Sequence, residues 1–223
     1  MWSPDGSNIA FGGGDLLDSL FQKPASGAGE EKVLLSEPGV IHAPTEYSHD
    51  GRFLLYYSSD ATGAPLAQFV LPLDGSKKPI TLVNPPGFGA GQGRLSPDMR
   101  WIAYVSTESG RREIYVRPFN ANGPSLGEGK WQISRDGGSL PAWRADGKEL
   151  FFRGPTGIMS AAVKAVGSAF EASAPERLFE LGSDGGWDVA ADGKRFLVSL
   201  ANAQQNGQVP ITVILNWQQM LKK

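Results

Sequence analysis

The sequence contains no cysteine, only two histidines and no long apolar run. The missing cysteines exclude disulfides, thiolate metal sites and a cysteine nucleophile, but they do not decide the compartment. No apolar stretch approaches the ~18 residues that span a bilayer, and no basic region followed by an apolar core marks a signal peptide. Lys and Arg number 21 against 23 Asp and Glu. This balance lacks the basic footprint of a polyanion binder, so we predict no nucleic-acid binding.

A ten-residue pattern recurs five times along the 223 residues. Its first copy, residues 2–11, reads WSPDGSNIAF, and the spacing between the aligned aspartates of successive copies is 45, 48, 48 and 46 residues. Those aspartates are Asp5, Asp50, Asp98, Asp146 and Asp192. Strand-like segments with this period are typical of β-propeller blades of four antiparallel strands. No segment has the sustained 3.6-residue apolar spacing of a long helix, so we predict an all-β chain.

The repeats divide the chain into about five blades that share one continuous core. The predicted blades are residues 1–36, 37–84, 85–134, 135–181 and 182–217, with a C-terminal tail at 218–223. The last strands are predicted at 195–200 and 211–215. Blade one keeps only the end of its inner strand, and blade five has no fourth strand. We therefore expect an incomplete ring cut from a larger propeller, with open blade edges available for self-association.

The pattern Trp-Ser-Pro-Asp-Gly-x-x-Ile-Ala-Phe resembles the Pro-Asp repeat of TolB-like β-propellers, a WD-repeat-like group. Three further segments, residues 109–119, 129–138 and 210–217, resemble the C-terminal propeller of bacterial eukaryotic-type Ser/Thr protein kinases. The resemblance covers essentially the whole chain. It implies a sensing or binding module outside the cytoplasm, which a membrane segment joins to a kinase domain in the parent protein. This sequence carries no kinase signature and no such membrane segment.

Two motifs suggest chemistry but lack the context that the chemistry requires. Residues 123–127 match Gly-x-Ser-x-Gly, the nucleophile elbow of hydrolases, which needs a preceding strand, a following helix and a later histidine. The two histidines, His42 and His49, both come earlier. The glycine-rich residues 87–93 lack a P-loop lysine and precede a strand. We therefore predict a loop at each motif.

Neither the histidines nor the repeated aspartates suggest a metal site. His42 and His49 stand seven residues apart around one strand, which places them on opposite faces, and Glu46 is the only nearby carboxylate. We expect His49 to be exposed in its turn. Aspartate bonds to nearby backbone in Pro-Asp-Gly turns, so we assign the five aspartates to turn formation. We predict no metal and no cofactor.

The hydrophobic residues that open each copy are predicted to pack between blades. This set comprises Trp2, Tyr47, Leu95, Trp143 and Val189.

The loops are the remaining place for function, because a rigid scaffold usually presents binding residues on its loops. In a propeller, the loops between second and third strands share one face with the links between blades. The residues predicted on this loop face are His42, Asp60, Glu108, Arg111, Arg112, Arg135, Asp136, Arg153 and Asp184. Both charge signs occur, which fits recognition of a protein, peptide or glycan, although an ordinary solvated rim has the same composition.

Two functions from different classes follow. The first is a noncatalytic binding or sensing module of a receptor kinase or another TolB-like protein. The second is the propeller of a prolyl-oligopeptidase-like hydrolase, or a propeller lyase or hydrolase that uses carboxylates of the central channel.

Overall fold

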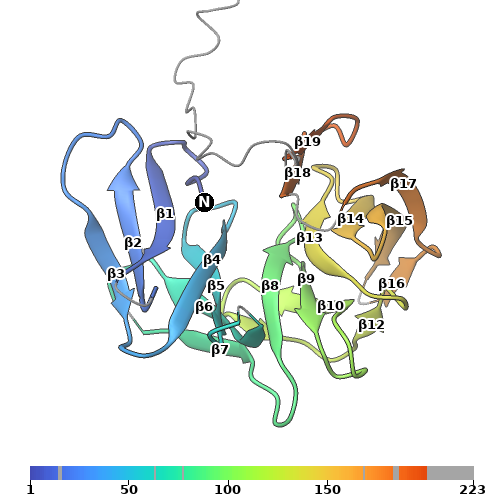
Figure 1. The fold of residues 1–223 in the computed structure, drawn as a ribbon, viewed down its shortest axis with the longest axis horizontal. Helices are drawn as coiled ribbons and strands as arrows, with labels where there is room; N and C mark the ends of the chain where they lie inside the picture. The colour runs from blue at the N-terminus through green and yellow to red at the C-terminus, as the bar shows by residue number, and fades with distance from the viewer. Residues whose placement is uncertain (15–16, 63, 77, 168, 183–185, 200–223) are drawn as a thin grey trace, which may run out of the picture.

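The structure is a computed structural model that describes residues 1–14, 17–62, 64–76, 78–167, 169–182 and 186–199. Within these residues the chain forms antiparallel sheets and no helix. Five sheets follow one another along the sequence and curl into an open arc, with β1 and β18 on either side of the opening (Figure 1). This arrangement confirms the predicted all-β, incomplete β-propeller. No helix in the described part of the chain has the length and apolar character needed to cross a membrane.

The sheets correspond to successive repeats of the sequence. The first contains β1 (Asn8–Gly13), β2 (Ser19–Pro24) and β3 (Lys32–Ser36), and the second contains β4 (Ile41–Tyr47), β5 (Phe53–Ser59), β6 (Pro65–Pro72) and β7 (Ile80–Val83). The third contains β8 (Ala90–Leu95), β9 (Trp101–Ser106), β10 (Glu113–Asn120), β11 (Ser125–Leu126) and β12 (Trp131–Gln132).

The fourth sheet, like the third, has one strand more than the predicted four. It contains β13 (Ser139–Trp143), β14 (Glu149–Arg153), β15 (Gly157–Val166), β16 (Ala169–Ala172) and β17 (Glu176–Glu180), of which β16 and β17 both pair with β15. The fifth sheet contains β18 (Trp187–Val189) and β19 (Phe196–Val198). The strand predicted at 211–215 and the tail at 218–223 lie outside the described residues. The exact blade limits stay a prediction.

One hydrogen bond of the repeated turn recurs in every copy. The Oδ1 atom of each aligned aspartate accepts the backbone N–H two residues later, at 3.0 to 3.1 Å. In the first three copies a serine two residues earlier also donates to the aspartate, and in the fourth copy Arg144 replaces that serine. These bonds confirm that the aspartates form turns.

In four of the five copies, the residue after the aspartate is a glycine with a left-handed backbone conformation. Gly6, Gly51, Gly147 and Gly193 have φ between 68° and 72°. Met99 occupies this position in the third copy with φ of 56°, where a side chain is strained because its Cβ approaches the following carbonyl.

Three apolar clusters join neighbouring sheets. Leu20 and Leu54 belong to the first cluster, Leu55 and Ile102 to the second, and Leu150 to the third. Every residue of β9 is buried, as expected for strands covered on both faces by adjacent blades.

The residues that open each copy do not all share this burial. Tyr47 and Leu95 are buried, whereas Trp143 and Val189 are half-buried. The prediction is wrong for Trp2, which is 61% exposed, because the described chain places no blade before the first one.

Polar contacts fix β8 against the second sheet. The amide N–H of Gly93 donates to Gln68 Oε1 at 2.7 Å, and its carbonyl accepts the Thr45 hydroxyl at 2.8 Å. Leu95 N–H donates to Glu46 Oε2 at 2.6 Å. Side chains of one blade therefore satisfy the backbone of the next, which sets the angle between the two sheets.

Candidate functional site on the loop face

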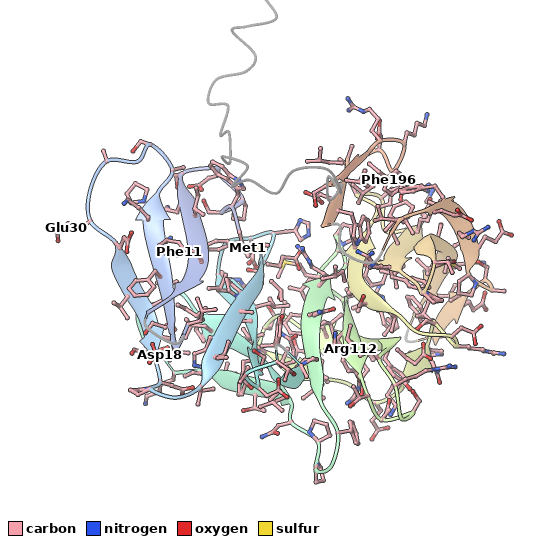
Figure 2. All side chains as sticks on the ribbon, viewed as in Figure 1. Met1, Phe11, Asp18, Glu30, Arg112 and Phe196 are labelled. Atoms are coloured by element: carbon pink, nitrogen blue, oxygen red, sulfur yellow. The ribbon has the colours of Figure 1, made fainter. Side chains whose placement is uncertain are left out.

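The structure brings most of the predicted site residues to one end of the blades. In Figure 2, Asp18 and Arg112, which follow second strands, lie toward the lower side, whereas Glu30 and Phe196 lie toward the upper side. Hydrogen bonds from the Thr62 hydroxyl and the Ala64 N–H hold the pKa of Asp60, in the loop after β5, below its ordinary value. The charge of Arg112, in the loop after β9, adds a smaller lowering.

Arg111 organises the link between the third and fourth blades. Its Nε donates to Glu113 Oε1 at 2.7 Å, and its Nη2 donates to the carbonyl of Arg135 and lies 3.5 Å from Asp136 Oδ1. The Glu113 side chain is 1% exposed and also accepts bonds from Ser134 Oγ and Gly137 N–H. Arg111 and Asp136 therefore hold the link in place as part of the scaffold.

Two further predicted residues also make contacts within the scaffold. Glu108 pairs with Lys130 at 2.5 Å across the blade. Arg153 donates through Nη2 to the carbonyl of Gly182, at the start of the link to the fifth sheet. Asp184 lies outside the described residues.

His42 lies inside the molecule and is not exposed on the loop face. It is 2% exposed, with Nε2 3.1 Å from Glu37 Oε2 and its ring edge-on to Tyr56 at 5.3 Å. Burial lowers the pKa of His42, with a partial opposing effect of Glu37. A neutral, buried imidazole packs between blades and has little surface for a ligand. His49 is exposed, as predicted, and no group of metal ligands occurs among the described residues.

A groove of about 540 Å³ opens between the third and fourth blades beside the Arg111 link. Phe152, Ile133 and Met159 form its apolar floor, and Arg135 and Arg177 are at its rim. Arg177 Nη1 lies 3.2 Å from Glu180 Oε1. The Arg135 guanidinium, by contrast, makes no interaction with any described residue, so this groove combines buried apolar surface with an available cation.

The sequence did not predict the floor residues of this groove, nor Arg177 at its rim. Phe152 and Met159 alternate like core residues of β14 and β15, and Arg177 reads as an ordinary charge on an outer strand. Only the pairing of two blades places them around one space, so no local pattern identifies them.

The loop predicted at each of the two motifs is only partly correct, because Ser125–Leu126 lies in β11 and residues 90–93 lie in β8. Ser125–Leu126 forms the short strand β11, which pairs with the end of β10, and no helix follows it in the described chain. The glycine-rich residues 87–93 continue into β8, where a Cβ on Gly91 would collide with Tyr57 and Pro65. These glycines permit close packing of blades.

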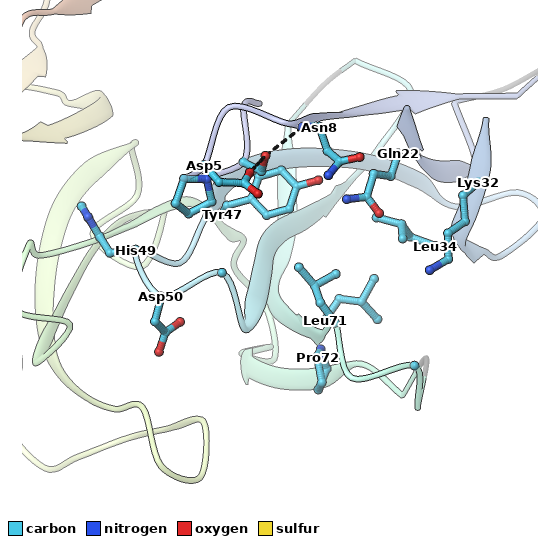
Figure 3. Close-up of a pocket in the computed structure, with 15 residues that line it drawn as sticks. Asp5, Asn8, Gln22, Lys32, Leu34, Tyr47, His49, Asp50, Leu71 and Pro72 are labelled. Atoms are coloured by element: carbon cyan, nitrogen blue, oxygen red, sulfur yellow. Dashed lines mark hydrogen bonds between the residues drawn. The ribbon is translucent and has the colours of Figure 1, made fainter. Parts of the chain in front are cut away.

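A separate cavity of about 350 Å³ lies on the turn face between the first two blades (Figure 3). Asp5 and His49 come from two successive turns, and Leu34 and Leu71 supply apolar surface. Burial raises the pKa of Tyr47, which lies beside Gln22 in this cavity. The site is an ordinary gap between repeats with polar walls, and none of the predicted site residues lines it.

The comparisons with known proteins show the fold. No family model and no curated protein matches the sequence. TolB from Acinetobacter baumannii is 19% identical with a TM-score of 0.62, over 86% of this chain and 45% of TolB. A putative TolB from Agrobacterium tumefaciens is 18% identical with a TM-score of 0.57, over 77% of this chain and 62% of that protein.

A puromycin-hydrolyzing peptidase from Mycobacterium tuberculosis shares the fold as well. It is 18% identical with a TM-score of 0.57, over 86% of this chain and 33% of the peptidase. The chain spans less than two thirds of each of these three proteins. It therefore has the architecture of a TolB-like β-propeller, a fold shared by proteins of different activities.

Proposed function

We propose that the chain is a noncatalytic recognition module that binds a peptide segment of a protein partner in the groove between its third and fourth blades. The observation that carries this proposal is the Arg135 guanidinium, which has no partner among the residues that the structure describes, beside an apolar floor. Ligand sites typically combine apolar walls with a few polar groups that fix orientation. Arg135 would take a carboxylate, because guanidinium groups match carboxylates in a bidentate geometry. The floor of Phe152 and Met159 would take an adjacent apolar side chain.

The chemistry of the groove favours binding over catalysis. The Ser134 hydroxyl donates to Glu113 and accepts Ile114 N–H, and the Ser173 hydroxyl donates to the carbonyl of Ala174 and accepts Ala162 N–H. The Glu113 carboxylate is the base beside Ser134, but Arg111 Nε and Gly137 N–H already donate to it, and Ser173 donates to a carbonyl, which is not a base. The bonds of these two hydroxyls therefore do not support the hydrolase alternative.

Selection from a random peptide library on the purified chain tests the proposal. We expect enriched peptides to place an acidic residue beside an apolar one, with affinities measured by isothermal titration calorimetry. Arg135→Ala should weaken binding about tenfold, which corresponds to ~1.4 kcal/mol. Arg195→Ala removes an exposed arginine near the turn of the fifth repeat and should change nothing.

Two outcomes would contradict the proposal. One is an enriched peptide whose affinity is insensitive to Arg135→Ala. The other is cleavage of the bound peptides, followed by mass spectrometry, which would support the hydrolase alternative.

A further inference from the structure

The additional strand of the fourth blade covers a cavity on the opposite, turn side of the molecule. Beyond its sheet, β15 continues to Val166 and folds back as β16, with Ala165 opposite Phe170. The guanidinium of Arg100, from the turn of the third blade, donates to the carbonyl of Gly167 at 2.7 Å. The hairpin of β15 and β16 therefore bridges two blades. A cavity of about 550 Å³ lies between the hairpin and the turns at 96–98 and 145–148.

Aromatic rings form the inner wall of this cavity. Phe170 is at the centre of the group, with ring centroids 5.0 Å from Trp101, 5.8 Å from Trp131 and 6.2 Å from Trp143. Trp101, Trp143 and Phe170 line the cavity directly. The corresponding cavity between the first two blades has Leu34 and Leu71 instead (Figure 3).

An unsatisfied donor belongs to this wall. Trp101 is 3% exposed, and its indole N–H has no hydrogen-bond partner within the part of the chain that the structure describes. A buried donor without an acceptor is uncommon in native proteins. Because its Nε1 is also sealed from solvent, Trp101 contributes ring surface to the cavity, and its N–H is out of reach of a ligand there.

The charged residues of the cavity leave an ammonium group available. The Asp146 carboxylate is paired with Arg144 Nε at 2.7 Å and Nη2 at 2.8 Å, and Lys148 adds to the positive charge around it. Asp98 accepts the Ser96 hydroxyl and a backbone N–H within its own turn. Lys164 is exposed on β15 and has no ion-pair partner among the described residues. Lys164 is therefore the cation of the lining that could pair with a ligand, while Asp98 keeps its negative charge within its own turn.

We infer that this cavity is a second binding site, separate from the peptide groove, for a small carboxylate carried on a flat aromatic ring. The ring would pack against Trp143 and Phe170, since aromatic rings attract each other in stacked and edge-on arrangements. The carboxylate oxygens would accept hydrogen bonds from the Lys164 ammonium. No bond is made or broken, and the hairpin holds the ligand between two blades.

Benzoate is the probe, and the neutral benzamide is its matched control. Saturable binding is measured by quenching of tryptophan fluorescence and by saturation-transfer NMR on the whole chain. We expect benzoate to bind at least about fivefold more tightly than benzamide, because only benzoate pairs with an ammonium. Lys164→Gln should weaken benzoate by about fivefold to tenfold and leave benzamide unchanged.

Two variants separate the site from general effects. Lys32→Gln removes a lysine from the cavity between the first two blades and should affect neither probe. Trp143→Leu replaces the half-buried ring against which the probes would pack, so benzoate and benzamide should both bind more weakly. The inference is wrong if benzoate and benzamide bind equally, if Lys164→Gln has no effect, or if no saturable binding occurs below about 10 mM, where the binding free energy is under 3 kcal/mol.

Discussion

Replacing Glu46 with glutamine should stabilise the protein at alkaline pH. Glu46 lies on β4, and its carboxylate faces β8 of the next blade, where Oε2 accepts Leu95 N–H at 2.6 Å. Burial raises the pKa of Glu46 from 4.5 to about 7, although the Arg94 charge and the Leu95 hydrogen bond both act to lower it. Desolvation therefore outweighs both attractive contacts at this blade interface.

The size and sign of the effect follow from this raised pKa. A difference of about 2.5 between the folded and unfolded pKa values of Glu46, at ~1.4 kcal/mol for each pH unit, corresponds to about 3 kcal/mol. Below about pH 4.5 the carboxyl is protonated in both states, so the native state bears no cost. Between about pH 4.5 and 7 the unfolded chain loses this proton while the folded chain keeps it, so stability falls. Above about pH 7 the group ionises in the folded chain as well, and the loss levels off at about 3 kcal/mol. Glutamine keeps an acceptor for Leu95 N–H without this ionisation.

Urea unfolding at pH 5 and pH 8, followed by tryptophan fluorescence, measures the effect. At pH 8 we expect Glu46→Gln to be more stable than the parent chain by up to about 3 kcal/mol, and at pH 5 the two should differ by under ~1 kcal/mol. Glu176→Gln, at an exposed residue, should show no such pH-dependent difference. If Glu46→Gln were destabilising at pH 8, the attraction of Arg94 would outweigh desolvation and the reasoning would fail.

Three smaller predictions concern the repeat turns and the packing of blades, each measured by chemical denaturation. Met99→Gly should be about 1 kcal/mol more stable than Met99→Ala, because both lose the same packing but only glycine relieves the positive φ; equal stabilities would refute the strain. Gly89→Ala should cost at least about 3 kcal/mol, since the new Cβ would overlap the carbonyl oxygen of Pro65. Gly123→Ala, which has open space, should stay within about 0.5 kcal/mol of the parent. Asp98→Ala should cost about 1 kcal/mol by loss of two hydrogen bonds, while Asp98→Asn should recover part of it. Identical losses for the two substitutions would argue against the turn bonds.

The fold could be predicted because the repeat encodes it locally. The aspartate of each turn bonds only to residues within its own copy, so five copies produce five turns irrespective of their neighbours. The strand β16 was missed for the opposite reason. Its four residues carry one buried apolar side chain, Phe170, and two of its three aromatic partners, Trp101 and Trp131, belong to the third blade. The exposed Trp2 was misjudged similarly, since burial requires a neighbouring blade as well as an apolar side chain.

The candidate sites show the same division between local and long-range information. Charge in a loop predicted Arg111, Arg135 and Asp136 together, but only the structure separates their roles. Arg111 pairs with Glu113 and Asp136 at the link between the blades. Of the three predicted residues, Arg135 is therefore the one able to bind a carboxylate. The Trp101 donor could not be predicted at all, because an unsatisfied group is defined by acceptors that stay out of reach on other strands. The residues best placed to bind a ligand are thus those whose polar groups have no partner within the fold. Which residues these are depends on how the blades pack together.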